Sequence, residues 1–468
     1  MGGLIQLVAY GEQDVVLTGN PTVTFFQAVY KRHTNFAMET IQQTTNGQIA
    51  TAAITSNSRI TVIVARNGDL AGEMYLELQS NNVTLGANVW SGFSNVVGTL
   101  DGTSWMAERA IQDVVLSIGG QQIDKHYQRW WRLYSELYLD ETKKIQYGKM
   151  TSNPNLSLGS TNNSNNNGTV YLPLLFFFNR NPGLYLPMIA LQYHEVRIDF
   201  DISPEFIYYF NPKYFNVWCN YMFLDQEERT MFAQKGHEYL IEQIQYTGAS
   251  QLTSAITTPG ASNATTTNTT FFPRITYNHP VKELVWCITQ NSSGGKQLWD
   301  FTDDASTTNQ VIITPNVSNN ITSNSYVPIS YATGTPVQRF GVTGNTPVQW
   351  IEDGNASGTT SFGPLESFKL IINGQDRMKA QTGKYFNQVQ PYYHHTGNPY
   401  PGIYSYSFAL KPEQHQPSGT CNFSRVDNSQ VSVTLKTGIK QFSYLEMFAV
   451  NYNVLRIQSG MGGLAFSN

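Results

Sequence analysis

The chain has 468 residues, of which 13% are charged and 13% aromatic, and its formal net charge is −4 at pH 7. A chain of this length exceeds what one hydrophobic core usually supports, so we expect two or more domains. The low share of charged residues argues against a helical bundle, and the sequence has no block of Lys and Arg that would bind nucleic acid phosphates directly. Thr, Asn, Gln, Ser and Gly fill most of the remainder, which is typical of strands joined by polar turns.

The cysteines and the N-terminus indicate where the protein is made. Cys219, Cys287 and Cys421 are far apart and odd in number, which argues against a disulfide framework and favours a reducing compartment. The first residues lack the basic and apolar regions of a secretory signal. The most apolar run, 172–178, is too short to cross a bilayer. We therefore expect a protein that is synthesised inside the cell and does not span a membrane.

The first half of the chain predicts an N-terminal arm at 1–30 followed by strands. Alternating apolar residues and turn signals such as Asn67-Gly68 predict strands at 38–44, 59–64, 74–78, 113–118, 170–177, 195–202 and 215–223. Helical spacing predicts a helix at 126–138. The stripe on this helix indicates core packing rather than a ligand cleft, and it consists of Trp130, Leu133, Tyr134, Leu137 and Tyr138.

A short helix near the middle of the chain is followed by a repeat of the opening strand. Charges lead the segment 225–234 and Gly236 ends it, which predicts a helix. His237 and Glu238 are predicted to form the turn after it. The strand predicted at 241–247 shares four of seven residues with 38–44. Further on, 369–375 resembles 116–121, and the aromatic segment 385–393 and strands at 431–435 and 444–457 parallel the end of the first half.

The repeat predicts an all-β fold of two tandem eight-stranded jelly rolls, a double jelly-roll, with a few short helices and long surface loops. The boundaries that we expect are an N-terminal arm at 1–30, a first jelly roll at 31–224, a helical linker at 225–236 and a second jelly roll at 237–468. The second copy carries the larger insertions, which are rich in Thr and Asn near 250–270 and 290–364.

The sequence offers only incomplete catalytic motifs. His237 and Glu238 begin a zinc-protease pattern, but Ile241 stands where the second histidine is required. The one histidine pair, His394-His395, keeps open an alternative, a bicupin-like metalloenzyme on a double β-barrel. Consecutive residues of a strand point to opposite faces, which argues against a shared metal. We therefore predict no catalytic residue, no cofactor and no metal ligand.

Asn-x-Ser/Thr sequons are frequent and cluster in the expected long loops, which marks those loops as exposed. Without a secretory signal, the glycosylation machinery of that route would not reach them. A third alternative, a cell-surface glycan-binding sandwich protein, is disfavoured for the same reason and by the unpaired cysteines. Asn162, Asn167 and Asn422 also stand in sequons, and the candidate glycan attachment sites are Asn82, Asn155, Asn263, Asn268, Asn291, Asn316, Asn320 and Asn355.

Several segments resemble one family over essentially the whole chain except the long loops. They include Gly3-Leu4-Ile5-Gln6-Leu7-Val8-Ala9-Tyr10-Gly11, then 32–39, 118–127, 190–196, 373–377, 451–457 and 459–465. The likeness is strongest at 407–412 and 416–425, where the family signature, read as structural, comprises Gln416, Pro417, Ser418, Gly419, Cys421, Asn422 and Arg425. The chain resembles the major capsid proteins of nucleocytoplasmic large DNA viruses, especially those that infect algae and other protists.

This resemblance implies a structural protein of the virion that is not an enzyme. It implies two tandem jelly rolls per subunit and a homotrimer that forms a pseudo-hexagonal capsomer of an icosahedral capsid around a large double-stranded DNA virus. The implied partners are further copies of the chain, neighbouring capsomers, and minor capsid and penton proteins, while the inner face approaches an internal viral membrane. The implied location is the virion, after synthesis and assembly in the host cytoplasm.

Overall fold

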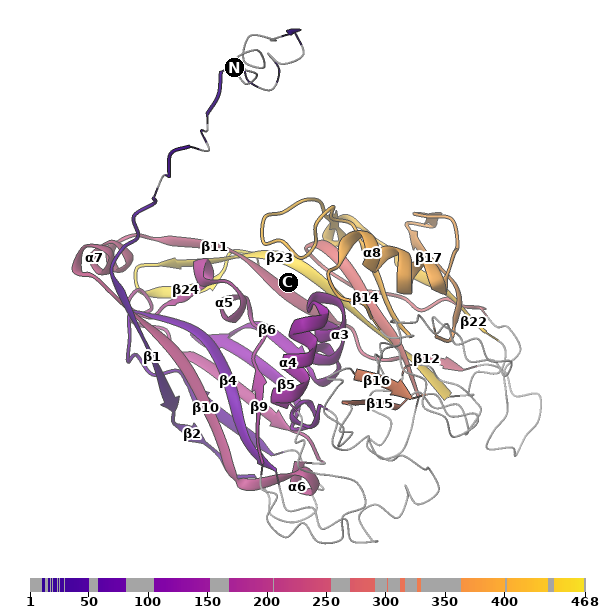
Figure 1. Ribbon diagram of the computed structural model, residues 1–468. Helices are drawn as coiled ribbons and strands as arrows, with labels where there is room; N and C mark the ends of the chain where they lie inside the picture. The colour runs from indigo at the N-terminus through magenta and orange to yellow at the C-terminus, as the bar shows by residue number, and fades with distance from the viewer. Residues whose placement is uncertain are drawn as a thin grey trace, which may run out of the picture. The chain divides into compact units, whose positions relative to one another are not determined.

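The computed structural model describes residues 30–49, 58–80, 105–151, 168–204, 206–253, 270–290, 301, 312–315, 326–329, 363–399, 402–436 and 442–466, with scattered positions between 11 and 28. The chain divides into two units, residues 1–36 and 37–468. The second unit contains the labelled helices and strands of Figure 1, except Phe36, the first residue of β1.

Two antiparallel sheets form the first jelly roll. One, which we name the long-strand sheet of this roll, has the order β1 (Phe36–Gln43), β10 (Phe210–Leu224), β4 (Leu70–Ser80) and β7 (Thr169–Pro173), with β8 (Leu186–Pro187) also paired to β4. The other, its short-strand sheet, has the order β2 (Thr45–Asn46), β3 (Arg59–Ile63), β9 (Val196–Ile202), β5 (Ile111–Ile118) and β6 (Gln121–Tyr127).

The second jelly roll has the same two kinds of sheet. Its long-strand sheet has the order β11 (His237–Tyr246), β23 (Phe442–Gln458), β14 (Pro280–Gln290) and β20 (Ile403–Ser407), and the additional pairings involve β12 (Ser250–Thr253), β21 (Cys421–Asn422) and β24 (Met461–Leu464). Its short-strand sheet has the order β13 (Thr270–Phe271), β22 (Ser429–Leu435), β17 (Leu365–Ile372) and β18 (Gln375–Asp376), with β19 (Gln381–Thr382) on β17. A separate hairpin joins β15 (Ile312–Pro315) to β16 (Tyr326–Ile329).

The strand order is the same in both rolls, which confirms the predicted double jelly-roll. We count β2 with β3 and leave out the hairpin β15-β16 and the short strands outside the main order of a sheet, which are β8, β12, β19, β21 and β24. The long-strand sheet of each roll then takes the first, eighth, third and sixth strands of the roll in chain order. The short-strand sheet takes the second, seventh, fourth and fifth. β1 and β11, whose sequences repeat, therefore hold equivalent places.

The segments 116–121 and 369–375, which resemble each other in sequence, form hairpins with equivalent turns. Gly119 and Gly120 join β5 to β6 with φ of 59° and 83°. Asn373 and Gly374 join β17 to β18 with φ of 51° and 78°. Two consecutive left-handed residues match the twist of a two-residue hairpin, and Gly and Asn adopt that conformation at the lowest cost.

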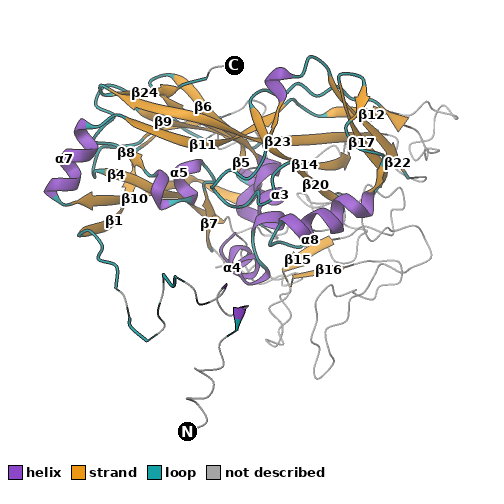
Figure 2. Ribbon diagram, turned by 90° about the horizontal axis from the view of Figure 1, so that it is seen from above, coloured by secondary structure: helices purple, strands orange, loops and turns teal. Residues whose placement is uncertain are grey.

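Short helices connect the strands (Figure 2). In the first roll these are the 3-10 turns η2 (Met106–Arg109) and η3 (Pro182–Leu184) and the α-helices α3 (Gln128–Tyr138), α4 (Glu141–Thr151), α5 (Phe177–Arg180) and α6 (Phe206–Tyr209). Helix α7 (Gln226–Gln234) follows β10, and the Asp225 side chain caps its first turn, as the charge pattern predicted. The second roll has the π-helical η4 (Tyr385–Val389), the 3-10 turn η5 (Phe423–Arg425) and α8 (Gln390–His394).

Two local predictions were wrong. His237 and Glu238 do not form a turn, because they pair with Ile457 and Arg456 at the far end of β23 and so begin β11. The strand predicted at 170–177 ends at Pro173, which lacks an N–H for further pairing, and Phe177 begins α5. The pair His394-His395, considered above as part of a strand, lies at the end of α8.

The interior of the second roll is organised around Trp286 of β14. Its ring lies 4.4 Å from the Phe368 ring, 5.3 Å from the Phe386 ring and 5.8 Å from the Tyr404 ring, measured between centroids. All four side chains are buried. Stacked and tilted aromatic pairs of this kind add to the burial of apolar area.

We expect Trp286→Ala to destabilise the protein by about 3–5 kcal/mol, because the cluster cannot collapse around a missing indole. Thermal unfolding followed by circular dichroism measures this as a lower melting temperature. Phe272→Ala is the matched control in the same roll, since the Phe272 side chain is 57% exposed. Equal melting temperatures for the two variants would contradict this account of the core.

Candidate functional site at the junction of the two rolls

The outward face of the second roll's long-strand sheet is buried against the first roll. Val285 of β14 and Phe448 of β23 belong to the hydrophobic cluster that also fills the first roll. Their neighbours Trp286, Met447 and Ala449 belong to the interior of the second roll. Because successive residues of a strand point to opposite faces, β14 and β23 are buried on both sides.

Aromatic side chains make the apolar part of this junction. Helix α3 lies beside strands of both rolls (Figures 1 and 2), and its Trp130 ring lies 5.8 Å from the Phe448 ring. Tyr127, at the end of β6, contacts Tyr246 of β11 at 4.8 Å, and Tyr246 stacks on Phe448 at 4.7 Å. Large rings with few rotatable bonds give extensive contact at low cost in side-chain entropy.

Backbone groups fix how closely α3 approaches the second roll. The Gly397 N–H donates to the Leu137 carbonyl, 2.9 Å away, near the end of the helix. A Cβ at residue 397 would collide with the Glu136 carbonyl oxygen, so the position requires glycine. The Lys144 ammonium of α4 donates to the Asn398 carbonyl at 2.8 Å. These hydrogen bonds satisfy backbone carbonyl groups at the junction and fix the position of residues 397–398 relative to α3 and α4.

The strands β6 and β11 are also tied together across the junction. The Ile244 N–H donates to Asp124 Oδ1 at 3.0 Å, and the Gln243 amide donates to the Ile123 carbonyl. At the same edge, the Leu464 N–H of β24 donates to Gln121 Oε1 at 3.1 Å. Polar contacts between β6 and both β11 and β24 leave little freedom for one roll to rotate on the other.

Ion pairs cross the junction at two places. Arg129 of α3 contacts Glu446 of β23 at 2.8 Å, and Glu446 also accepts from Thr289 Oγ1 at 2.9 Å. Glu242 of β11 accepts from Arg180 of α5 at 3.0 Å and from Lys282 of β14 at 2.6 Å. Glu242 thus joins one cation from each roll.

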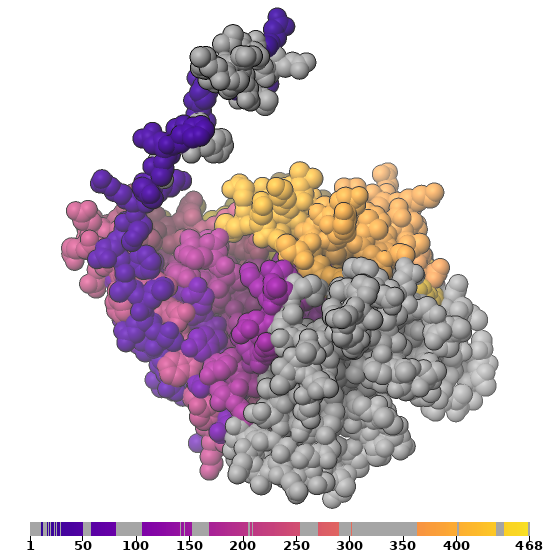
Figure 3. All heavy atoms as spheres, in the orientation of Figure 1, coloured from indigo at the N-terminus to yellow at the C-terminus, as the bar shows by residue number. Residues whose placement is uncertain are grey.

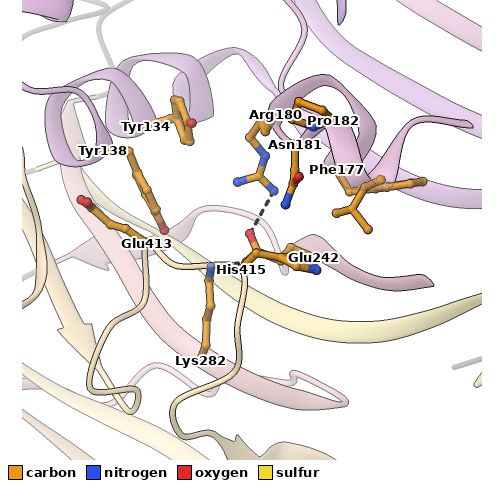
Figure 4. A pocket seen from close by; sticks show the side chains of 11 residues that line it. Tyr134, Tyr138, Phe177, Arg180, Asn181, Pro182, Glu242, Lys282, Glu413 and His415 are labelled. Carbon is orange, nitrogen blue, oxygen red and sulfur yellow. Dashed lines mark hydrogen bonds and ion pairs between the residues drawn. The ribbon is translucent and has the colours of Figure 1, made fainter. Parts of the chain in front are cut away.

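Arg180, Glu242 and Lys282 belong to the lining of a pocket of about 250 Å³ between the rolls (Figure 4). Tyr134 and Tyr138 of α3 and Arg180 of α5 line it from the first roll. From the second roll it is lined by Glu242, Lys282, Glu413 and His415. The predicted core role of the α3 stripe is thus partly right, since Trp130, Leu133 and Leu137 are buried while Tyr134 and Tyr138 also face this pocket.

Burial and charge act in opposite directions on the groups of this cluster. Burial disfavours the ionised form of Glu242, but Arg180 and Lys282 outweigh it and hold the pKa of Glu242 below its ordinary value. Burial lowers the pKa of Lys282, although the neighbouring Glu242 opposes this. At neutral pH Glu242 is therefore the anion on which both cations depend.

A second buried group beside the pocket is the Glu283 carboxyl, which contacts a histidine. The Glu283 carboxyl lies 3.3 Å from His395 Nε2, and His395 Nδ1 lies 3.4 Å from Glu413. Burial raises the pKa of Glu283 well above its ordinary value, and Glu413 adds to the rise. Burial lowers the pKa of His395. Both shifts favour the uncharged form, because an uncompensated charge is costly in the interior.

The charged groups of the junction hold the two rolls in place. Within the described part of the chain, no group of three or more His, Cys, Asp and Glu residues is arranged to hold a metal ion, and none of the described helices is long and apolar enough to cross a membrane. The charged groups pair with one another across the junction. This arrangement can hold two rolls in one fixed orientation.

The structure places the family signature on a loop and a short strand beside the pocket. Ser418 accepts from the Lys411 N–H at 2.9 Å, which closes the loop that carries Glu413 and His415. Gly419 has φ of 141°, and Cys421 pairs with Val281 of β14. Asn422 Oδ1 accepts from the Ser424 N–H, while Gln416, Pro417 and Arg425 are exposed.

Nearly all of the predicted glycan sites lie outside the described part of the chain. Asn82, Asn155, Asn263, Asn268, Asn291, Asn316, Asn320 and Asn355 all lie outside the described residues, as do Asn162 and Asn167. Asn422 is described and exposed, and its side-chain oxygen caps η5. The assignment of these asparagines to glycan attachment stays a prediction.

Sequence reasoning missed the junction charges. Lys282 and Glu283 lie in β14, where two adjacent charged residues, both buried, interrupt a mostly apolar sequence. A buried strand that keeps charged residues is a signal for paired or functional groups. Lys282 pairs with Glu242 and Glu283 contacts His395, both distant in the sequence, so residue spacing gave no indication of these partners.

The fold and the junction define a class, a double jelly-roll protein whose two rolls lie in one compact unit and share buried contacts. Comparisons agree with this class. Residues 228–463 match the family model of the large eukaryotic DNA virus major capsid protein, and residues 24–225 match the model of the major capsid protein N-terminus.

Known proteins of algal viruses are similar along their whole length. The major capsid protein of Paramecium bursaria Chlorella virus 1 is 39% identical over 100% of both chains, and that of Phaeocystis pouchetii virus is 38% identical over 100% of both. A solved structure of PBCV-1 VP54, a crystal structure fitted into a reconstruction of the virophage Sputnik, is also similar. It superposes with a TM-score of 0.69 at 33% sequence identity and covers 95% of this chain and 100% of that chain. The chain belongs to the major capsid protein family of large eukaryotic DNA viruses.

We expect Glu242→Gln to destabilise the protein by about 3–5 kcal/mol, because Arg180 and Lys282 would lose their buried counter-charge. Glu238→Gln is the matched control on the same strand. Its pair with Arg456, at 2.8 Å, joins side chains that are 61% and 56% exposed, and exposed pairs contribute at most about 1 kcal/mol. Denaturant unfolding at pH 7 measures both changes.

The effect of Glu242→Gln has a defined pH dependence. Because the pKa of Glu242 is lowered in the folded chain, its contribution is present above the ordinary carboxyl pKa and is lost as the pH falls through its lower folded value. The two proteins should therefore converge in stability at acidic pH. A difference that stayed constant down to pH values below that folded pKa would show that the charge of Glu242 is not the cause.

We expect Glu283→Gln to change stability by less than about 1 kcal/mol at mildly acidic pH, because the amide replaces a carboxyl that is already protonated. The raised folded pKa means that the wild-type protein loses stability as the pH rises above the ordinary carboxyl value near 4.5, whereas the variant does not. Melting temperatures of both proteins across pH 5 to 8 test this. A loss as large as that of Glu242→Gln at every pH would mean that Glu283 is ionised.

Proposed function

We propose that this chain is the repeating building block of an icosahedral viral shell, and that three copies form a capsomer of pseudo-hexagonal outline. The observation that carries this proposal is the presence of two rolls of identical strand order, held in one orientation by a buried junction. Three such chains present six similar rolls. A ring with six similar sides can repeat the same edge contacts with all its neighbours in a flat lattice.

Each part of the chain has a role in this arrangement. Residues 31–224 and 237–468 each supply one side of the capsomer, residues 225–236 link them, and residues 1–30 form an arm. Helix α7 supports the position of the linker, since it lies between the last strand of the first roll and the first strand of the second. The family signature at Gln416–Arg425 supports the loop at the junction through the contacts of Ser418 and Asn422.

The partners in this proposal are other copies of the same chain, minor capsid proteins and penton proteins. Contacts between capsomers need not be strong individually, because each capsomer meets several neighbours at once. The inner face lies toward an internal membrane, and the chain reaches the virion after synthesis and assembly in the host cytoplasm.

The role is structural rather than catalytic, because the buried charges of the junction compensate one another and hold the rolls together. The alternative, a bicupin-like metalloenzyme, differs in a measurable way. Stoichiometric iron, manganese or zinc in the purified protein would favour the enzyme.

We expect the purified protein to form a trimer in solution, with a mass three times the 52.5 kDa of the chain. Size-exclusion chromatography with light scattering at micromolar concentration measures this mass. A monomer under these conditions would contradict the proposed capsomer. A dimer would contradict it equally, because two chains supply only four rolls.

A further inference from the structure

The two long-strand sheets have the same topology but differ in how their outward faces are covered. In the second roll this face is buried by the first roll of the same chain, through contacts such as Trp130 with Phe448. In the first roll the outward side chains of β4 and β10, which include Tyr75, Glu77 and Trp218, are only half-buried. Atoms of β1, β4 and β10 are visible at the surface in Figure 3.

This exposed face carries aromatic rings held by carboxylates. Trp218 lies opposite Tyr75 in the pairing of β10 with β4, and its Nε1 donates to Glu77 Oε2 at 2.6 Å. Glu77 also accepts from the Tyr214 hydroxyl at 3.2 Å. On β7, Tyr171 lies opposite Glu77 and is 37% exposed. A preorganised surface of Tyr and Trp rings with polar groups between them is typical of a protein interface.

The second roll has a helical segment at the place where the first roll has α3. In each roll a helical segment follows the two-residue hairpin and precedes the sixth strand, as α3 in the first and η4 with α8 in the second. In the first roll that segment supplies the cover for the neighbouring sheet. In the second roll its Tyr392 and Tyr393 are 80% and 72% exposed.

More apolar and basic surface surrounds these two tyrosines. Leu410 is 75% exposed, and its carbonyl oxygen lies 3.2 Å from Nδ1 of His394, the residue after Tyr393. Arg377 and Lys379, which precede η4 in the chain, are exposed. In the first roll Arg129, at the start of α3, pairs with a carboxylate on the sheet that α3 covers. Arg377 and Lys379 give this segment positive charges, which complement carboxylates such as Glu77 on the sheet of the first roll.

We propose that the Tyr392–Tyr393 surface of one chain packs on the outward face of the first roll's long-strand sheet in a second copy of the chain. The contact repeats between chains the one that α3 makes within a chain. It is heterologous, so every copy offers one of each surface, and such contacts close into a ring when the rotation between copies permits. The inference rests on the proposed function, because it names the surfaces that join chains within the trimer.

A photo-crosslinking experiment tests the contact directly. Tyr393 is replaced by p-benzoylphenylalanine, an aromatic substitution at an exposed position that leaves the fold intact. After irradiation of the purified protein, we expect covalent dimers and trimers on a denaturing gel, with mass spectrometry placing the cross-link in residues 70–80 or 210–224. The same replacement at Tyr193, which is 75% exposed, is the control and should give no cross-link to those strands.

A second measurement uses the double substitution Tyr392→Ser with Tyr393→Ser. Because both rings are exposed, the melting temperature of the isolated chain should not change, while the dissociation constant of the trimer should rise by at least about 30-fold, as is usual for the loss of aromatic hot spots. Tyr193→Ser is the matched control and should leave the constant unchanged.

The outcomes separate this inference from the proposed function. A wild-type protein that is monomeric would overturn both. A trimer whose cross-links from residue 393 fall on other segments, or whose affinity is unchanged by the double substitution, would overturn only the assignment of these surfaces. Cross-links to β4 or β10 together with weakened assembly would support it.

Discussion

Burial of the second roll's long-strand sheet on both faces holds the two-roll arrangement together. One face packs around Trp286 in the interior of its own roll, and the other packs on α3 through Phe448. Without the first roll, the outward face would be a contiguous exposed apolar surface, which soluble proteins rarely tolerate. The second roll therefore depends on the first for its cover, and the junction is an extension of a core rather than a contact between independently stable domains.

Apolar burial alone would not fix the angle between the rolls, because it has no direction. Direction comes from the close approach at Gly397 and from Glu242, which accepts from one cation of each roll. Buried ion pairs add little net stability once their desolvation is counted, but they are costly to break. A rotation of one roll on the other would separate Arg180 from Glu242. The arrangement therefore tolerates one orientation, which suits a subunit whose two rolls must meet neighbours at fixed angles.

Alternating polar and apolar residues in the sequence predicted strands such as β1 and β11. Asp225 and Gly236 mark the ends of the α7 region, so the repeat of the opening strand and the helix between the rolls were recognisable. β14 was not predicted, because a strand buried on both faces has no alternation. The resemblance to a known family, rather than periodicity, supplied the function.

The junction was less predictable than the strands. The pairing of His237 with Ile457 replaced a predicted turn by strand, since the free edge of β23 extends far enough to receive it. Arg180, Glu242 and Lys282 come from three separate elements, and only the folded chain brings them together. Long-range pairing of this kind follows from topology, which residue spacing in one sequence does not encode.

The outward faces of the two long-strand sheets differ in polarity. The face buried within the chain is apolar, with Val285 and Phe448, because it is covered as soon as the chain folds. On the equivalent face of the first roll, aromatic rings donate hydrogen bonds to carboxylates, as Trp218 does to Glu77. In the proposed assembly this face is exposed to water before another chain covers it, so its polar groups must be hydrogen-bonded in both states. The two sheets share one topology, and the difference in when they are covered accounts for an apolar outer face on only one of them.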